Sequence, residues 1–370
     1  MTAAAPTELG ELIARRIRAT GPITVAEFMA EALQHPRLGY YTTRDPLGAA
    51  GDFITAPEVS QAFGELIGLW CAETWELMGR PDPVLLVELG PGRGTLMADA
   101  LRALAVAPSF RRALHVHLVE TSPALQSAQA KTLAAAAPSW HESLEAVPSA
   151  PALLIANEFL DALPIRQFVR RRDGWHERRI GLGPDGHALV FALDPGVGPA
   201  AALIPPRLAA APEGSIAEIC PTAISLAQDL ARRLTRDGGA ALFIDYGHAA
   251  SVCGDTLQAV RQHRYHPVLD SPGSADLTAH VDFEAFAAAA RGAGARVCGP
   301  VSQGEFLRAL GIETRLRQLQ AKASPEAGMR LERGVHRLID GAEMGTLFKV
   351  LALMHPDMPT PAGFPASPAA

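Results

Sequence analysis

The segment Val84-Leu-Leu-Val-Glu-Leu-Gly-Pro-Gly-Arg-Gly-Thr95 determines the fold that we expect for this chain. Its first half, residues 84–89, is a short apolar run, which predicts a buried strand. Its second half contains three glycines, which let the chain turn sharply and let a ligand approach the backbone. A helical pattern follows directly. A strand, a glycine-rich turn and a helix in this order are typical of a cofactor-binding α/β domain.

The rest of the chain repeats this alternation of strands and helices. Apolar runs predict further strands, and apolar residues at helical spacing predict helices. Alternation of this kind indicates a parallel sheet covered by helices on both faces. The expected strands are Leu114–Glu120, Ala152–Ala156, Ala240–Asp245 and Thr346–Leu353, and the expected helices are 8–18, one that follows a capping box at Thr24 and Glu27, and 58–79.

Other regions depart from this alternation. Residues 165–215 contain short β-like runs, which predict an antiparallel insertion, and residues 303–340 predict helices before the last strand. Residues 35–57 are rich in Gly and Pro, and a loop of this length is typical of a functional lid. We therefore expect N-terminal helices and a lid loop over 1–80, a cofactor-binding domain over 81–358 with the two insertions, and a flexible tail over 359–370.

The composition excludes several classes of protein. With 370 residues, 48% of them hydrophobic and 19% charged, the chain can bury a large core and is not disordered. Its net charge of −6 disfavours a nucleic-acid binder, because phosphate recognition needs a basic excess. The 4 cysteines are far apart, which disfavours both a metal site and a disulfide scaffold. No apolar run is long enough for a membrane span and no signal peptide is recognised, so we expect a cytoplasmic protein.

The glycine loop carries an acid that helps to identify the cofactor. Glu88 stands two residues before Gly90 in the pattern Glu88-x-Gly90-x-Gly92-x-Gly94. A dinucleotide fingerprint has its third glycine one position later, where this chain has Thr95. A carboxylate would repel a diphosphate, but it would attract the ammonium group of a methionine moiety. The loop therefore favours S-adenosylmethionine over a nicotinamide dinucleotide.

A second acid ends the next expected strand. Glu120, followed by Thr121, is placed to accept hydrogen bonds from ribose hydroxyls, a role common to both cofactors. The alternative is structural: the glycine loop packs a helix on the sheet, and Glu120 is the N-cap of the next helix.

The exit of the following strand predicts the reaction site. Asn157, Glu158 and Asp161 follow this strand, and ligands of open α/β sheets lie beyond the carboxyl ends of the strands. Methyl transfer needs a positioned acceptor, and carboxylates can hold a guanidinium by paired hydrogen bonds. Alternatively, Asn157 is a turn residue and Asp161 is an acid in the first turn of a helix. The segment is not Asn-Pro-Pro-Tyr, which disfavours a base or glutamine acceptor.

The expected lid supplies two further candidates. Asp52 and Thr55 could contact the cofactor when the loop closes. The alternative is an ordinary loop followed by a helix that is capped near Thr55.

The chain resembles a known family along nearly its whole length. The resemblance runs from about residue 8 to residue 355. It is carried by GPITVAEFM at 21–29, GYYTTRDPLGAAGDFITAPEVSQAFGE at 39–65, VELGPGRGT at 87–95, NEFLDALP at 157–164, DYGH at 245–248 and GSADLTAHVDF at 273–283. These motifs are similar to the mitochondrial complex I assembly factor 7 (MidA-like) family, whose members depend on S-adenosylmethionine and include bacterial proteins.

The resemblance implies a fold, a cofactor site and an activity. The implied fold is the Rossmann-like α/β fold of class I methyltransferases, with a seven-stranded sheet, helices on both faces and family-specific insertions. The implied activity is symmetric dimethylation of arginine in a protein, which in mitochondrial members is the 49-kDa subunit of complex I. The implied site places the cofactor motif on Glu88, Gly90, Gly92 and Gly94, the ribose acid on Glu120, and the second motif on Asn157 and Glu158.

We therefore expect an S-adenosylmethionine-dependent methyltransferase that acts on arginine in a protein. Its expected location is the cytoplasm in a bacterium or the mitochondrial matrix in a eukaryote. Three alternatives stay open: a methyltransferase of small molecules, an assembly chaperone that binds the cofactor without catalysis, and a nicotinamide-dependent dehydrogenase.

Overall fold

The computed structural model describes residues 7–43 and 55–366. The chain divides into two compact units. The first unit consists of Met1–Phe53, Asp161–Ser225 and Ala250–Ala285, and the second of Ile54–Leu160, Leu226–Ala249 and Phe286–Ala370. These boundaries differ from the domain boundaries expected from the sequence, which stay a prediction.

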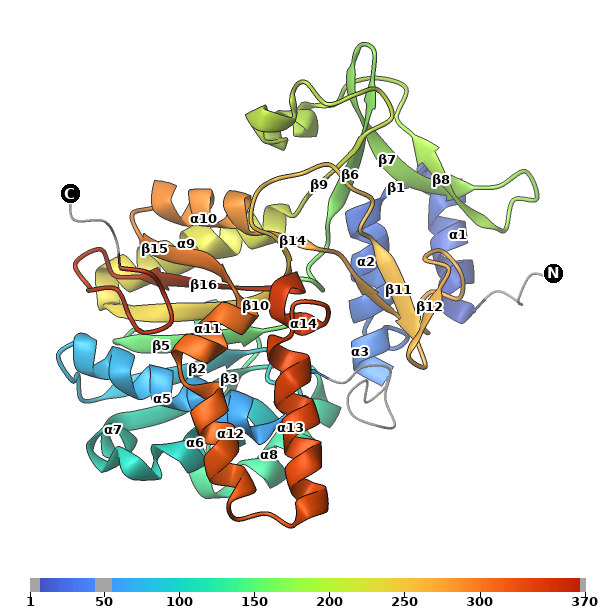
Figure 1. Ribbon diagram of the computed structural model, residues 1–370. Helices are drawn as coiled ribbons and strands as arrows, with labels where there is room; N and C mark the ends of the chain where they lie inside the picture. Colours follow the sequence, from blue (N-terminus) through green and yellow to red (C-terminus); the bar gives the residue numbers. More distant parts are fainter. Residues whose placement is uncertain (1–6, 44–54, 367–370) are drawn as a thin grey trace. The chain divides into compact units, whose positions relative to one another are not determined.

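The second unit is built on one large sheet. Its strands follow the order β15-β16-β10-β5-β2-β3-β4 (Figure 1). Neighbours from β10 to β4 are parallel, and β16 is antiparallel to both of its neighbours. The bounds are β2 (Val84–Leu89), β3 (Leu114–Val119), β4 (Ser139–His141), β5 (Ala152–Asn157), β10 (Gly239–His248), β15 (Arg296–Ser302) and β16 (Phe348–Met354). This sheet confirms the predicted fold class.

Helices cover both faces of this sheet. Figure 1 shows α5 and α6 on one face and α9 and α10 on the other. Every residue of β2 and of β5 is buried, as expected for parallel strands covered on both sides. The bounds are α5 (Gln61–Leu77), α6 (Thr95–Ala103), α7 (Pro108–Ala113), α8 (Pro123–Thr132), α9 (Pro221–Asp237) and α10 (Phe283–Gly292), with short 3-10 helices at Leu104–Val106, Ala134–Ala136 and Leu144–Ala146.

The single helix predicted over 58–79 is two helices. A short helix, α4 (Ala56–Val59), precedes α5. Ser60 separates them, because its backbone is extended (φ −157°, ψ 130°) and its hydroxyl accepts the N–H of Ala62 at the start of α5. The helical pattern of the sequence does not reveal this break, because a serine is compatible with both a helix and a cap.

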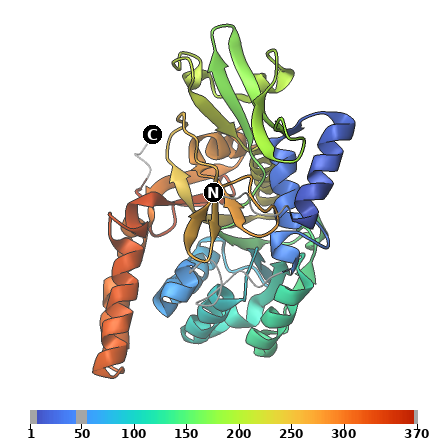
Figure 2. The same cartoon turned by 90° about the vertical axis from the view of Figure 1, so that its right-hand side faces the viewer.

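Four helices lie between β15 and β16, and three of them fall within residues 303–340, where helices were predicted. They are α11 (Gln303–Ala309), α12 (Ile312–Gln320), α13 (Pro325–Ile339) and α14 (Met344–Leu347). The fourth ends at Leu347, so the last strand begins two residues later than predicted. Figure 1 shows α12 and α13 side by side, and Figure 2 shows this helical region turned by 90°. Arg315 on α12 donates to the buried carboxylate of Glu65 on α5 (2.8 Å), and Arg102 donates to the same carboxylate (3.0 Å). This network joins the inserted helices to the helices on the sheet.

The segment after β16 contacts the rest of the second unit, and these contacts include part of the tail predicted over 359–370, whose flexibility stays a prediction. Trp70 donates its indole N–H to the carbonyl of Ala362 (3.2 Å), and Arg296 donates to the hydroxyl of Thr360 (2.7 Å). The ring of Phe364 lies 5.4 Å from that of Phe306. Prolines remove backbone donors but leave carbonyls that side chains can bind, and composition alone does not reveal such partners.

The first unit combines N-terminal helices with an antiparallel sheet. The capping box predicted at Thr24 and Glu27 is present, because each side chain bonds to the backbone N–H of the other residue. The helices are α1 (Glu8–Thr20), α2 (Val25–Gln34) and α3 (Tyr40–Thr43), with 3-10 helices at Pro199–Leu203 and Pro206–Leu208. The sheet has the order β1-β7-β6-β9, with β8 paired to β7. Its strands are β1 (Ile23–Thr24), β6 (Arg166–Arg171), β7 (Gly174–Leu182), β8 (Leu189–Leu193) and β9 (Ile216–Ile219).

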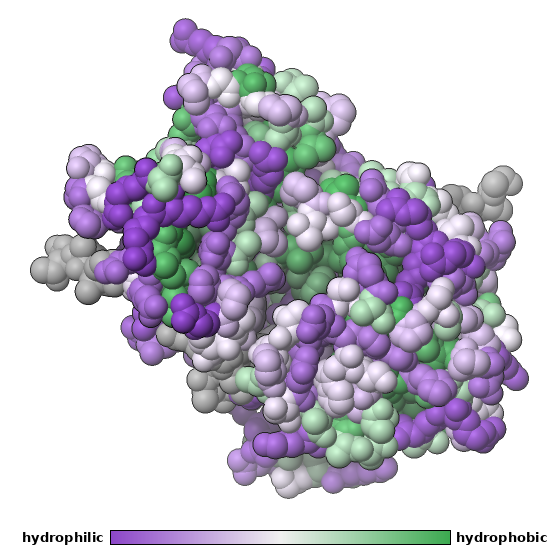
Figure 3. Space-filling view, turned by 180° about the vertical axis from the view of Figure 1, so that it is seen from behind, coloured by the Kyte–Doolittle hydropathy of each residue, from purple (hydrophilic) through white to green (hydrophobic). Residues whose placement is uncertain are grey.

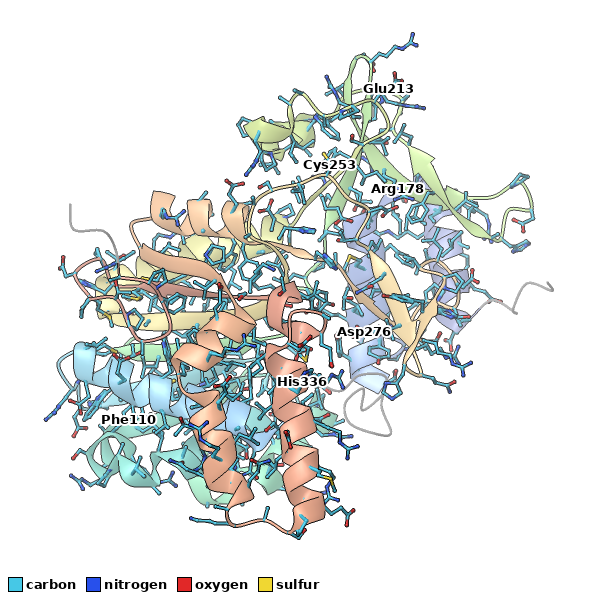
Figure 4. All side chains as sticks on the ribbon, viewed as in Figure 1. Phe110, Arg178, Glu213, Cys253, Asp276 and His336 are labelled. Atoms are coloured by element: carbon cyan, nitrogen blue, oxygen red, sulfur yellow. The ribbon has the colours of Figure 1, made fainter. Side chains whose placement is uncertain are left out.

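Several arginines of this sheet pair with carboxylates of their own unit. Arg166 binds both carboxylate oxygens of Glu177 at 2.6 Å. Arg178, labelled in Figure 4, donates to Asp255 (2.8 Å) and lies 3.5 Å from the ring centroid of Phe191.

The unit also contains a three-stranded sheet of β12 (Arg264–His266), β11 (Gln258–Arg261) and β13 (Asp276–Thr278), followed by β14 (Val281–Asp282).

The visible surface mixes polar and apolar residues. Seen from behind, hydrophilic residues alternate with hydrophobic ones (Figure 3). Within residues 7–43 and 55–366, every helix is too short or too polar to span a lipid bilayer.

Candidate active site

The glycine loop connects the central strand β2 to α6 in the second unit. Gly90, Gly92 and Gly94 all have positive φ angles, of 63°, 53° and 80°. This left-handed region is costly for residues with a Cβ atom. At Gly90 the space is also limited, because a Cβ there would lie 2.9 Å from the ring of Phe159, a residue beyond the end of β5. Conformation and close packing therefore both require glycine in this loop.

Glu88 is a buried carboxylate on the central strand β2. Its side chain lies on β2 and is 3% exposed, and its Oε2 has no hydrogen-bond partner among the described residues. Burial raises the pKa of Glu88 to about 8. A ligand ammonium beside it would satisfy the carboxylate, whereas a diphosphate would not. The site therefore fits the methionine end of S-adenosylmethionine.

Glu120 lies directly after β3 and is also buried. Its Oε1 accepts the backbone N–H of Ser122 (2.8 Å), and its Oε2 accepts the side-chain amide of Gln129 (3.2 Å). Burial raises the pKa of Glu120, although these hydrogen bonds oppose the shift. Ser122, not Glu120, is the N-cap of α8, so the alternative that Glu120 caps this helix is wrong. Thr121, between them, is exposed.

Asn157 and Glu158 meet at the exit of β5. Glu158 has a φ of 49°, and its Oε1 accepts the N–H of Ala56 (2.9 Å) and the amide of Asn157 (3.1 Å). The Oδ1 of Asn157 is buried and has no hydrogen-bond partner among the described residues. The structure thus brings these two predicted residues together and adds the start of α4. A left-handed backbone at a non-glycine residue is an unusual conformation that often occurs at functional sites.

Asp245 holds the turn after Glu158, a role that the sequence did not predict. Its Oδ2 accepts the N–H groups of Phe159 (3.1 Å) and Leu160 (2.9 Å), and its Oδ1 accepts the N–H of Tyr246 (2.9 Å). The sequence offered one signal for such a role, because Asp245 is the last residue of an expected strand. Its partners lie 85 and 86 residues away in the chain, and no sequence pattern specifies such a pairing.

The remaining predicted residues are placed as follows. Thr55 is half-buried at the N-cap of α4, and its side chain makes no capping bond. The residue two positions after Thr55 is Pro57, which has no N–H to donate, and the first N–H of α4 goes to Glu158. Asp161 belongs to the first unit, where its side chain is buried and its carbonyl accepts the N–H of Ala279 (3.0 Å). Asp52 lies outside the described residues.

The strand order, the glycine loop after the central strand and the acid after the neighbouring strand together define a class I, S-adenosylmethionine-dependent methyltransferase. A family model described as "Putative S-adenosyl-L-methionine-dependent methyltransferase" matches residues 66–301, and the chain belongs to this family. The predicted cofactor is therefore confirmed.

Similar proteins support the same assignment. The chain is 40% identical to a Xenopus tropicalis protein named protein arginine methyltransferase NDUFAF7, mitochondrial, over 94% of this chain and 87% of that protein. The human protein of this name is 39% identical over 92% of this chain and 81% of its own length. A Burkholderia thailandensis structure with bound S-adenosylhomocysteine is 29% identical, with a TM-score of 0.82 over 98% of this chain and 97% of that one. The resemblance stated from the motifs is confirmed.

The pKa of Glu88 predicts how stability depends on pH. The folded protein without ligand keeps a proton on Glu88 up to about pH 8, whereas the ordinary value is 4.5. Between these values the folded state binds more protons than the unfolded state, so the Glu88 contribution to the free energy of unfolding falls as pH rises. Glu88→Gln should remove this contribution. Melting temperatures of both proteins should be measured from pH 5 to pH 9. The melting temperature should fall less with rising pH in the variant than in the wild type. Parallel curves would contradict the conclusion that burial raises the pKa of Glu88.

Proposed function

We propose that this protein methylates an arginine side chain of another protein. The observation that carries this proposal is the pair of Asn157 and Glu158 at the exit of β5, whose next residue, Phe159, packs against the glycine loop. The arrangement supports an acceptor position beside the cofactor site. The names of the relatives, which describe protein arginine methyltransferases, support the same acceptor.

S-Adenosylmethionine, when bound, supplies a methyl group on a positively charged sulfur. We propose that Glu88 binds the amine of its methionine part, that Glu120 and Thr121 bind its ribose, and that the loop of Gly90, Gly92 and Gly94 accommodates its close approach. Asp52 and Thr55 are proposed as further contacts from the segment before α4. Each assignment follows from charge or from the space that a ligand needs next to the backbone.

Glu158 would hold the acceptor. A guanidinium stays protonated at neutral pH and carries donors in a planar fork, so a carboxylate binds it strongly and with a defined orientation. This contact would direct one nitrogen toward the methyl group. That nitrogen would form the new N–C bond as the methyl–sulfur bond breaks, and it would release one proton to the carboxylate or to solvent. We propose that Asn157 supports Glu158 through their hydrogen bond and that Asp161 contributes a second carboxylate.

The substrate protein is proposed from the family. The relatives are named mitochondrial, and the resemblance implies a 49-kDa-type subunit of complex I with symmetric dimethylation. We propose a subunit of this type as the acceptor, reached in the mitochondrial matrix of a eukaryote or in the cytoplasm of a bacterium.

Labelling would test the acceptor. The protein is incubated with S-adenosylmethionine carrying a labelled methyl group and with a lysate of its own host that lacks the native copy. We expect label in a protein band, and acid hydrolysis of that band should release methylated arginine. Label only in small molecules would instead indicate a small-molecule methyltransferase, and cofactor binding without any labelled acceptor would indicate a chaperone.

A further inference from the structure

We infer that Gln129 is a positioning residue: it fixes the position of the glycine loop relative to the ribose-binding carboxylate of Glu120, as cofactor binding requires. This inference rests on the proposed cofactor site. Gln129 lies on α8, outside every motif that the sequence analysis identified, and its side chain is completely buried.

The amide of Gln129 joins two parts of the site. Its Nε2 donates one hydrogen bond to the carbonyl of Gly92 (2.7 Å) and a second to Oε2 of Glu120 (3.2 Å). An amide nitrogen has two hydrogens, so these bonds use its full donor capacity. A single side chain thus determines where the middle glycine lies relative to the acid on the neighbouring strand.

Trp140 fixes the orientation of this amide. The indole N–H of Trp140, on β4, donates to Oε1 of Gln129 (2.8 Å). If the amide turned over, Oε1 would face the carbonyl of Gly92 and the carboxylate of Glu120, and both acceptors would lose the hydrogen bond from Gln129. The nitrogen therefore stays directed toward the cofactor motifs.

These bonds prepare Glu120 for a ribose. The carboxylate has about four lone-pair positions. The protein donors on its two oxygens favour the ionised form and set its plane, and positions remain for a hydroxyl. Without Gln129, Glu120 would lose a donor and the loop would lose an anchor. The loss that acts through the loop affects both kinds of ligand, whereas the loss that acts through Glu120 affects only ligands that carry ribose hydroxyls.

A comparison of two ligands separates positioning from general stability. We would measure the Kd of S-adenosylhomocysteine and of an analogue that lacks both ribose hydroxyls, and take their ratio for each variant. In Gln129→Met, which keeps the length of the side chain but has no donors, the preference for the hydroxyl-bearing ligand should fall about tenfold, or about 1.4 kcal/mol.

Gln303→Met is the matched control. Gln303 is also completely buried and donates to a backbone carbonyl, that of Leu338 (2.8 Å), on α11 of the same unit. This variant should lose stability but keep the wild-type preference.

Trp140→Phe is a second test of the inference. It keeps both donors of Gln129 but removes the hydrogen bond that orients the amide. We expect it to lower the preference less than Gln129→Met does, and it remains a test of the inference if Gln129→Met does not fold.

Each outcome separates the inference from the proposed site. If Glu120→Ala abolishes the preference while Gln129→Met and Trp140→Phe keep the wild-type value, the inference is wrong and the ribose site stands. If Glu120→Ala also keeps the wild-type preference, the ribose site itself is wrong, and the inference fails with it.

Discussion

Gly92→Val should abolish measurable binding of S-adenosylmethionine. Gly92 has a φ of 53°, and a β-branched residue in this left-handed region carries strain of about 1–3 kcal/mol. The loop would relieve this strain by moving, which would displace the carbonyl of Gly92 from Gln129. Since the cofactor must approach this backbone closely, we expect a loss of affinity of at least about a hundredfold, or about 2.7 kcal/mol. Titration calorimetry with the purified protein measures it.

Gly186→Val is the matched control for backbone strain. Gly186 has a similar φ of 70°, belongs to the first unit, and has no atom within 4 Å of the position where a Cβ would lie. This variant should carry a similar strain and still bind the cofactor. Unchanged affinity in Gly92→Val would remove the glycine loop from the proposed site, whereas equal losses in both variants would show that the effect is general destabilisation.

Glu158→Gln should lose methyl transfer and keep cofactor binding. The amide keeps an oxygen that can accept the N–H of Ala56, but it has no negative charge to hold a guanidinium. A charge-assisted contact made at the reacting group is worth several kcal/mol, so kcat should fall about a hundred- to a thousandfold. Initial rates with a labelled cofactor and the acceptor protein measure kcat, and calorimetry measures cofactor affinity.

Glu305→Gln is the control for the contact that Glu158 makes with a backbone N–H at the start of a helix. Glu305 also accepts a backbone N–H at a helix N-terminus, that of Ser302, and it lies on α11. Its replacement should leave kcat unchanged. Full activity of Glu158→Gln would exclude the proposed contact with the acceptor. Loss of cofactor affinity together with activity would instead show that Glu158 acts through the position of α4.

The parts of this molecule that were predicted correctly depend on residues close together in the chain. The glycine loop, its strand and its helix occupy residues 84–103, and the capping box at Thr24 and Glu27 spans four positions. Hydrophobic periodicity and local hydrogen bonds act over such distances, so the sequence pattern carries them. The acids Glu88 and Glu120 were predicted as site residues from their places on or directly after an expected strand, and their roles stay a prediction.

The parts that were missed depend on partners far away in the chain. Asp245 holds the turn after Glu158, and Gln129 reaches back 37 residues to the carbonyl of Gly92. The tail was expected to be free, yet Trp70 binds its residue 362 from 292 positions away. A glutamine or an aspartate has the same appearance in the sequence whether it faces solvent or joins two loops.

By itself, the sequence determined the class of this protein, through the alternation of strands and helices, the glycine loop that follows residues 84–89 and the acids Glu88 and Glu120. Only the tertiary structure decided which side chains hold that site in place, and that the chain passes from one compact unit to the other between Leu160 and Asp161. The physical reason is the distance along the chain over which each kind of interaction acts. Backbone conformation and burial follow local pattern, whereas the partner of a buried polar group depends on which distant segments the folded chain brings together.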